Sequence, residues 1–379
     1  MTAIDASDWA DEFPVREQLV YLNHAGICPI PARTARAIAE QAADYRDFGS
    51  THYRRWAEVA ARGRARLAEL MGAAPAEVAF VRSTTAGLLI VAESIPWREG
   101  DTIVVADIEF PANVYPWLNQ ERRGVRVRFV PARERFPTVD DYAAACDAHT
   151  RVIAASWVQF ATGQRTDLAA LAQLARDVGA YLVVDAIQGL GALRMDVQAL
   201  GIDFLCADGH KWLLSVEGCG ALHVSSRVLG DLEPFWRGWM SVPDSGDYLG
   251  YGQPPRDDAR RFEEGAPNML GAAALDASVG LLLEAGPAAV EERVLALTAH
   301  VAEGARRLGC EITSPFGDGR RSAIICCRHP RVSADEIVAH LSGRGIAAAG
   351  RLGSVRLSPH FYNTEDELDR ALAAVGECL

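Results

Sequence analysis

An aspartate and a lysine are the side chains of this sequence whose types and spacing are most specific for chemistry. Asp185 ends the apolar run 181–184, and Lys211 stands in the segment 208–212. Such a pair suits pyridoxal phosphate, because the amine can form a Schiff base with the cofactor aldehyde and the carboxylate can keep the pyridine nitrogen protonated. We therefore predict that Asp185 and Lys211 lie on one sheet and bind this cofactor.

Lys211 is expected to be half buried. Gly209 and His210 precede it, and Trp212 begins an apolar run. Burial lowers the pKa of an amine and favours its neutral, nucleophilic form. A surface lysine is the ordinary alternative, but this chain is rich in arginine and poor in lysine, which favours a covalent role.

A phosphate site is predicted where a strand gives way to a helix. Ser83, Thr84 and Thr85 follow a strand-like run and open an apolar stretch. Hydroxyls and free backbone N–H groups at a helix N-terminus bind anions. The same residue types are ordinary helix caps, so this prediction depends on the neighbouring cofactor pair.

Four further polar side chains are predicted near the same site. Gln188 follows Asp185 by about one helical turn and is expected to donate to the phenolic oxygen of the cofactor, while His210 is expected to brace the phosphate or the ring. Gln159 ends a neighbouring strand and is expected to face the ring or the substrate. Arg356, in an alternating run, offers a fork for a substrate carboxylate. The alternative for each is a satisfied polar residue at a domain seam or at the surface.

Apolar runs alternate with amphipathic stretches between about residues 60 and 230, a pattern typical of a largely parallel sheet covered by helices. The predicted strands are 77–81, 102–106, 125–130, 151–156, 181–185, 204–206 and 220–224. The leucines of 167–178 recur at three- and four-residue intervals, which predicts a helix that stops at Gly179.

Three divisions are predicted along the chain. Residues 1–20 form an N-terminal segment, 21–265 a large cofactor-binding domain and 266–379 a smaller C-terminal domain. Within the large domain, residues 232–261 lack periodicity and are expected to form a long ordered loop or lid. Two helices of the small domain are predicted from capping boxes that begin at Ser333 and Thr364.

The composition indicates an ordinary globular protein, with 379 residues of which 49% are hydrophobic and 23% charged. Neither an apolar stretch of roughly 20 residues nor a targeting pattern at the start is found, so a cytoplasmic protein is expected. A net charge of -12 disfavours nucleic acid as a partner. The eight cysteines show no metal-ligand spacing, so no metal is predicted, and Cys28 is kept as a candidate reactive thiol.

Several motifs in the same order resemble the class V aminotransferase family of fold-type-I pyridoxal phosphate enzymes, which includes cysteine desulfurases, isopenicillin N epimerase and kynureninase. The likeness runs from about Tyr21 to Ala374. The matching segments are 21–25, 80–87, 112–117, 184–188, 209–211, 261–268 and 356–363. The resemblance implies an α/β architecture in which a large domain with a mostly parallel seven-stranded sheet precedes a smaller α+β domain.

The resemblance also implies roles for individual residues, with Lys211 as the internal aldimine. The residues assigned to the cofactor are Lys211, Asp185, Gln188, Thr84, Thr85 and His210, and those assigned to the substrate are Arg356, Asn23, His24 and Asn113. It implies a homodimer as well, in which the segment at Gly265 reaches the active site of the partner. The family often has a threonine after this glycine, and Ala266 lacks the hydroxyl that would meet the phosphate.

The chain departs from the desulfurase pattern in ways that bear on the reaction. Phe110 stands where desulfurases resembling this chain carry a histidine on the cofactor ring. The phenylalanine can still stack on the ring, but it cannot act as a general acid or base. The short segment 350–354 lacks the cysteine that accepts sulfur in one desulfurase subgroup. Asp208 replaces a serine near the phosphate and is expected to face His210 or solvent.

We predict an enzyme that acts at Cα of a small amino acid and is aminotransferase-like. A cysteine desulfurase-like C–S lyase or an epimerase is the alternative, because these reactions share the loss of the Cα proton and differ in later steps. A pyridoxal phosphate-binding scaffold without turnover is the third hypothesis, and the intact Lys211, Asp185 and Arg356 argue against it. The expected partners are the amino acid and a second copy of the chain, with neither nucleic acid nor membrane.

Overall fold

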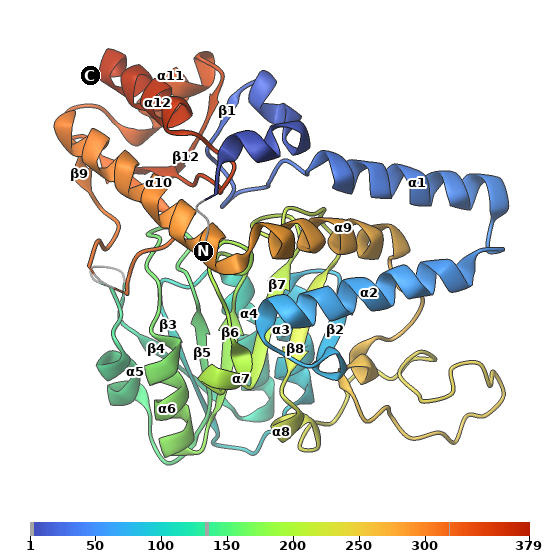
Figure 1. The fold of residues 1–379 in the computed structure, drawn as a ribbon. Helices are drawn as coiled ribbons and strands as arrows, with labels where there is room; N and C mark the ends of the chain where they lie inside the picture. Colours follow the sequence, from blue (N-terminus) through green and yellow to red (C-terminus); the bar gives the residue numbers. More distant parts are fainter. Residues whose placement is uncertain (1–3, 133–135, 318) are drawn as a thin grey trace.

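A seven-stranded sheet runs through the large lobe of the molecule (Figure 1). The computed structural model describes residues 4–132, 136–317 and 319–379. In spatial order the strands are β2 (Val78–Val81), β8 (Gly220–Val224), β7 (Phe204–Asp208), β6 (Tyr181–Asp185), β5 (Thr150–Ser156), β3 (Thr102–Ala106) and β4 (Arg126–Val130). Strand β8 runs antiparallel to both neighbours, whereas the other pairs are parallel. The predicted fold-type-I α/β class is confirmed, and each predicted strand is present with only its ends shifted.

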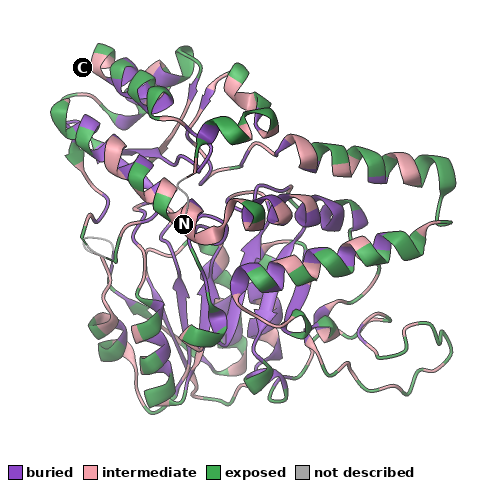
Figure 2. Ribbon diagram, in the orientation of Figure 1, coloured by how far each residue is buried: buried purple, intermediate pink, exposed green. Residues whose placement is uncertain are grey.

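Alternate residues of the strands supply two apolar cores, one on each face of the sheet. Val104 and Ile153 belong to one core, while Ile103 and Val105 belong to the other. The helices of this lobe that follow the strands are α3 (Thr84–Ser94), α4 (Tyr115–Leu118), α5 (Val139–Ala145), α6 (Leu168–Val178), α7 (Val197–Leu200) and α8 (Ser226–Leu229). Figure 2 shows the strands buried and the outer faces of these helices exposed. The polar residues at the strand ends therefore sit at the edge of a rigid core.

Two long helices, α1 (Ala32–Phe48) and α2 (Tyr53–Met71), run antiparallel beside α9 (Met269–Ala285) (Figure 1). Most of α9 is buried against them. In the part of the chain that the structure describes, no single helix has the length and apolar character of a membrane span. Helices α9 and α10 (Pro287–Arg307) have that length and apolar character only when they are taken together, and the chain bends by 79° between them.

The small lobe is built on a four-stranded antiparallel sheet. Its strands in spatial order are β12 (Ala349–Arg351), β13 (Ser354–Leu357), β10 (Ile325–Arg328) and β9 (Glu311–Ile312), and its helices are α10, α11 (Ala334–Gly343) and α12 (Glu365–Cys378). The predicted capping boxes at Ser333 and Thr364 are present. Strand β1 (Val20–Tyr21) pairs with β11 (Ile346–Ala347), so the start of the chain packs with this lobe. The division at residues 265 and 266 remains a prediction about domains.

The stretch from residue 230 to 258 contains neither helix nor strand. Hydrogen bonds order this stretch. Arg256 Nε donates to the carbonyl of Met240 at 3.0 Å, and Ser241 Oγ donates to the carbonyl of Glu263, beyond the stretch, at 3.1 Å. Tyr248, Leu249 and Tyr251 project from it with exposed side chains. The predicted long loop is thus present, while its role as a lid remains a prediction.

Candidate active site

The candidate site lies at the carboxyl ends of the parallel strands, where α/β sheets commonly bind ligands. Asp185 is the last residue of β6, and its register partners are Ser156 of β5 and Cys206 of β7. Lys211 follows the end of β7 after a two-residue turn. The two predicted residues are therefore placed together by neighbouring strands.

Asp185 is a deeply buried carboxylate, with 2% of its surface exposed. Its Oδ1 accepts a hydrogen bond from the backbone N–H of Ile187 at 3.1 Å. Burial raises the pKa of Asp185 to about 6, and the positive charge of Lys211 opposes this rise. A carboxylate in this setting is stabilised by any cation placed beside it, such as a protonated pyridine nitrogen.

Lys211 is the single lysine of the chain. Burial lowers the pKa of its amine to about 8, although the charge of Asp185 favours the protonated form. The charges of Arg356 and Arg351 lower the pKa further. The Nζ atom lies 5.9 Å from the centre of the Phe110 ring, and within the described residues it has no ion pair. A neutral amine is therefore accessible near neutral pH, as nucleophilic attack requires.

Helix α3 begins beside the turn that carries Lys211. Its N-cap Ser83 accepts from the backbone N–H of Ala86 at 3.1 Å, and the Thr84 hydroxyl accepts from the N–H of Asp208 at 2.9 Å. Thr85, next along the helix, is exposed. The predicted anion site thus consists of the start of α3 and the Thr84 and Thr85 hydroxyls.

Asp208 does not face this helix start directly. One carboxylate oxygen lies 2.9 Å from Nδ1 of His210, and the other accepts from the N–H of Gly209 at 2.7 Å. The expectation that Asp208 faces His210 is confirmed. Since Asp208 engages Nδ1, the other ring nitrogen, Nε2, is left for a second partner such as a phosphate.

The two predicted glutamines have protein partners. Gln188 donates from Nε2 to the carbonyl of Ala25 at 3.0 Å and accepts from Trp212 Nε1 at 3.0 Å. One Nε2 hydrogen of Gln188 is left to donate, so the expected contact with a phenolic oxygen remains a prediction.

Gln159 instead organises the loop after β5. Its Oε1 accepts from the N–H groups of Ala161 and Thr162 at 2.7 Å and 2.9 Å, and its Nε2 donates to the carbonyl of Ile108 at 2.6 Å. One Nε2 hydrogen of Gln159 is left to donate, so the expected contact of this amide with the ring or the substrate remains a prediction.

Arg356 enters the site from β13 of the small lobe. It is 1% exposed, and it donates from Nη1 to the carbonyl of Phe160 at 2.7 Å and from Nη2 to Oδ1 of Asn23 at 3.4 Å. Its Nε is buried without a partner among the described residues. Burial, and the charge of Arg351, lower the pKa of Arg356 to about 10. An orphaned donor on a buried guanidinium is what a carboxylate ligand would satisfy, and Asn23 lies beside it.

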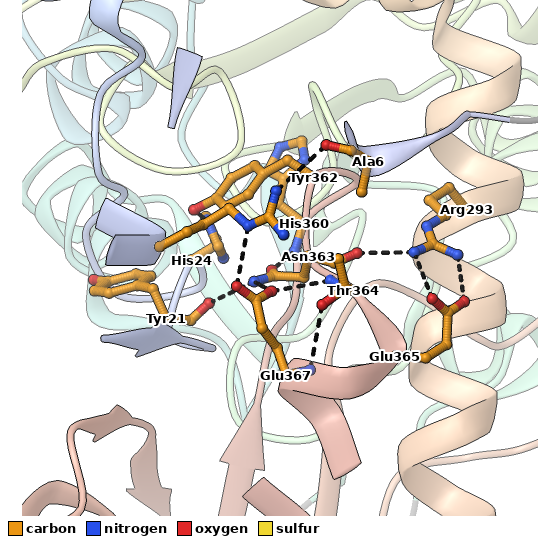
Figure 3. A network of polar contacts seen from close by, with 11 residues as sticks. Ala6, Tyr21, His24, Arg293, His360, Tyr362, Asn363, Thr364, Glu365 and Glu367 are labelled. Atoms are coloured by element: carbon orange, nitrogen blue, oxygen red, sulfur yellow. Dashed lines mark hydrogen bonds and ion pairs between the residues drawn. The ribbon is translucent and has the colours of Figure 1, made fainter. Parts of the chain in front are cut away.

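His24 and Asn113 are both packed in the interior, and their expected contact with the substrate remains a prediction. The ring nitrogens of His24 lie 2.9 Å from the carbonyl of Ser358 and 2.7 Å from the Tyr362 hydroxyl. Figure 3 shows His24 beside Tyr362. Asn113 is fully buried, and its Oδ1 accepts from Trp117 Nε1 at 3.0 Å. His24 therefore joins the start of the chain to the small lobe, and Asn113 fixes the segment after Phe110.

Two thiols near the site, those of Cys28 and Cys326, are buried. Cys28 is buried, its Sγ donates to the carbonyl of Ser215 at 3.4 Å, and burial raises its pKa to about 12. Cys326 is the register partner of Arg356 on β10, donates to the carbonyl of Ala161 at 3.2 Å, and has a pKa that burial raises to about 11. A thiolate is disfavoured at both positions, so neither is equipped to accept sulfur.

One carboxylate of the site was not predicted. Glu109 follows β3, and its side chain accepts from the backbone N–H of Ser156 at 2.7 Å and from the Ser156 hydroxyl. Burial raises the pKa of Glu109 to about 7, and the negative charge of Asp185 adds to the rise. Its place three residues after the end of a parallel strand and just before Phe110 is the signal in the sequence that points to it.

These features fit pyridoxal phosphate. The cluster offers an amine without an ion pair, a buried carboxylate, a helix N-terminus with two hydroxyls, and an aromatic ring near the amine. The Arg356 donor remains for a substrate carboxylate. The site therefore has the parts of a pyridoxal phosphate enzyme.

Comparison with known proteins gives the same class. The chain belongs to the class-V aminotransferase family, whose model matches residues 20–371, and the cofactor that goes with this site and family is pyridoxal 5′-phosphate. A probable cysteine desulfurase of Methanothermobacter thermautotrophicus is 30% identical over 97% of this chain and 96% of its own length. An uncharacterised aminotransferase of Bacillus subtilis, YcbU, is 28% identical over 89% of this chain and 90% of its own.

Solved structures share the fold. An apo cysteine desulfurase of Thermococcus onnurineus NA1 superposes with a TM-score of 0.89 at 23% identity, covering 100% of this chain and 98% of its own. A complex of the cystine C–S lyase C-DES with cysteine persulfide gives 0.88 at 22% identity, covering 96% and 99%. The names of the relatives favour the C–S lyase alternative over the aminotransferase-like main prediction.

Proposed function

We propose that this protein is a C–S lyase that breaks the Cβ–S bond of a sulfur-containing amino acid and releases the sulfur directly. The observation that carries the proposal is the combination of the Lys211 amine, with its lowered pKa, and two neighbouring thiols that burial keeps protonated. The similarity to proteins named cysteine desulfurase supports the C–S bond as the target. The raised pKa values of the Cys28 and Cys326 thiols support sulfur leaving as a free product.

Each group of the site would contribute one task. Pyridoxal phosphate supplies an electron sink for the electrons of the Cα–H bond. Lys211 Nζ would hold the cofactor through its aldehyde and, once the substrate amine has displaced it, take the Cα proton. Asp185 would keep the pyridine nitrogen protonated, and Arg356 would hold the α-carboxylate so that the Cα–H bond faces Lys211.

The sulfur then leaves with the electron pair of the Cβ–S bond. Cysteine would give sulfide, and a disulfide-linked substrate would give a persulfide. Water completes the reaction by converting the remaining amino acid skeleton into pyruvate and ammonia. Phe110 would stack on the ring, and it offers no proton to the departing sulfur.

We propose that the enzyme works as a homodimer. The segment 263–268 lines a cavity together with Phe80, Arg82 and Trp236, next to the start of α3. This arrangement would let the segment and the exposed loop before it meet a second copy. Size-exclusion chromatography with light scattering measures the mass directly, and a monomer at micromolar concentration contradicts the proposed dimer.

The reaction is tested by mixing the holoenzyme with L-cysteine, L-cystine and L-alanine in turn. The proposal expects pyruvate together with sulfide or persulfide from the sulfur substrates and no product from alanine. A keto acid formed with transfer of the amino group to the cofactor, and without sulfur release, would show an aminotransferase instead. Exchange of the Cα proton for solvent deuterium without any other product would show an epimerase.

A further inference from the structure

Two arginines share one face of the small sheet. In the antiparallel pair of β12 and β13, Arg351 is opposite Ser354, and Ala349 is opposite Arg356. Residues opposite each other in an antiparallel pair, and residues two apart on one strand, point to the same side. Arg351 therefore lies on the face of the sheet from which Arg356 enters the active site.

Arg351 has an exposed side chain and no acidic partner among the residues that the structure describes. Its Nη1 donates to the carbonyl of its neighbour Gly350 at 2.6 Å. The strand turns immediately afterwards through Leu352 and Gly353, both with positive φ (47° and 73°). This tight turn fixes the backbone of Arg351 at the end of β12, and the exposed guanidinium has no ion pair among the described residues.

The positive charge of Arg351 interacts electrostatically with groups inside the site. It lowers the pKa of both Lys211 and Arg356, so it lies within electrostatic reach of the amine and of the carboxylate-binding arginine. The α-carboxylate of an amino acid needs one guanidinium fork, and buried Arg356 with its orphaned Nε provides it. The second, more exposed cation is left for a second anionic group farther from Cα.

We propose that Arg351 selects substrates whose sulfur carries an anionic substituent, by pairing with a carboxylate or sulfonate on the leaving group. This inference rests on the proposed C–S lyase function and names its substrate class. Arg356 would bind the end of the substrate that reacts, and Arg351 the end that leaves. A thiol or a neutral thioether would lack the second contact.

Two ligands of nearly the same shape isolate this charge, namely S-carboxymethyl-L-cysteine and its neutral amide, S-carbamoylmethyl-L-cysteine. The dissociation constant of each is measured on the holoenzyme from the change in cofactor absorbance, and pyruvate release is followed separately. The wild-type protein is expected to bind the acid about tenfold more tightly than the amide, the scale of one charge-assisted hydrogen bond. Equal binding of the two ligands by the wild-type protein would overturn the proposal.

Variants assign the preference to Arg351. Arg351→Gln is expected to bind the two ligands equally and to bind L-alanine as the wild-type protein does, while Arg351→Lys keeps a preference. Arg328→Gln is the matched control, because Arg328 lies on the same sheet but is paired with Glu311 at 2.8 Å, and it should keep the full preference. An undiminished preference in Arg351→Gln would overturn the proposal.

The binding measurement tests the role of Arg351, and the pyruvate measurement tests the C–S lyase function, so either proposal can fail without the other. Tighter binding of the acid that Arg351→Gln abolishes, without any pyruvate, would support the role of Arg351 and count against the C–S lyase function. Pyruvate from both ligands with equal dissociation constants would support the lyase and overturn the role of Arg351. Arg356→Gln should weaken both ligands alike, which separates the two arginines.

Discussion

Two leucines with left-handed backbone lie in the turns that follow Lys211 and Arg351, and they differ in how deeply they are buried. Leu214 has a φ of 56° and is fully buried in the turn after Lys211, where its N–H donates to the Lys211 carbonyl at 3.1 Å. Leu352 has a φ of 47° and is 70% exposed in the turn after Arg351. A non-glycine residue in this conformation costs about 1–2 kcal/mol. Burial offsets that cost at Leu214, whereas little does at Leu352.

The candidate site thus has two halves that the protein supports in different ways. The half that would hold the cofactor is made of strand ends and turns locked into the main core, so its geometry depends on the whole large lobe. The half that would choose the substrate is a short surface hairpin, whose side chains can change without disturbing a core. The reaction type is therefore expected to depend on the first half and the substrate preference on the second.

The largest effect is expected from Lys211→Ala. Removing the only ε-amine of the chain removes the proposed proton carrier at Cα, and such groups contribute about 10²–10⁴-fold to rates. Pyruvate release should fall by at least that factor, and unfolding of the apoprotein by urea should show the fold intact. Activity within tenfold of the wild-type rate in a folded variant would place the chemistry elsewhere.

Asp185→Asn should lose activity and gain stability. Turnover is expected to fall about 10²–10³-fold, as when a preorganised charge is removed. Burial raises the pKa of Asp185 from 3.8 to about 6, so between these pH values the unfolded chain releases its proton first and the stability of the apoprotein falls as the pH rises.

The asparagine has no charge to bury, so the variant should be more stable by up to about 3 kcal/mol at pH 7, with no gain below about pH 4. Urea unfolding of both apoproteins at pH 4 and pH 7 measures this. An equal gain at both pH values would contradict the buried charge as its cause.

The leucine comparison is tested by changing each residue to glycine. Leu214→Gly loses a buried side chain and is expected to lower the free energy of unfolding by about 1–4 kcal/mol, even after backbone relief. Leu352→Gly loses only exposed surface and should raise it by up to about 1 kcal/mol. Urea unfolding of the apoproteins gives both numbers, and two changes of the same sign would refute the distinction.

The smallest effect is expected from Cys28→Ser. The serine hydroxyl keeps a donor for the carbonyl of Ser215, and sulfur release should stay within about twofold of wild type, as for ordinary tolerated changes. A tenfold or greater loss with unchanged cofactor binding would instead mean that Cys28 accepts sulfur.

Local patterns in the sequence predict the parts of the site that depend on neighbours in the chain. Asp185 at a strand end, Lys211 in an apolar turn and the pairing of Asp208 with His210 all follow from short segments, as do the caps of α6 and α12. The class V motifs add the correct fold and family.

Other features depend on contacts between distant segments, which residue types do not encode. The ring nitrogens of His24 have their partners in Ser358 and Tyr362, more than three hundred positions away. Glu109 gains its raised pKa only because tertiary packing buries it near Asp185. Gln159 has a typical ligand side chain, and its Oε1 accepts hydrogen bonds from the loop that follows it.

The most direct test of the central claim uses the fact that Lys211 is the only lysine. The holoenzyme is reduced with borohydride, and its intact mass and peptides are measured beside those of Lys211→Arg treated in the same way. We expect one pyridoxal phosphate per chain, on the peptide that contains Lys211, and none on the variant. A reduced protein without the added mass, or with the cofactor on the N-terminal amine alone, would contradict the account.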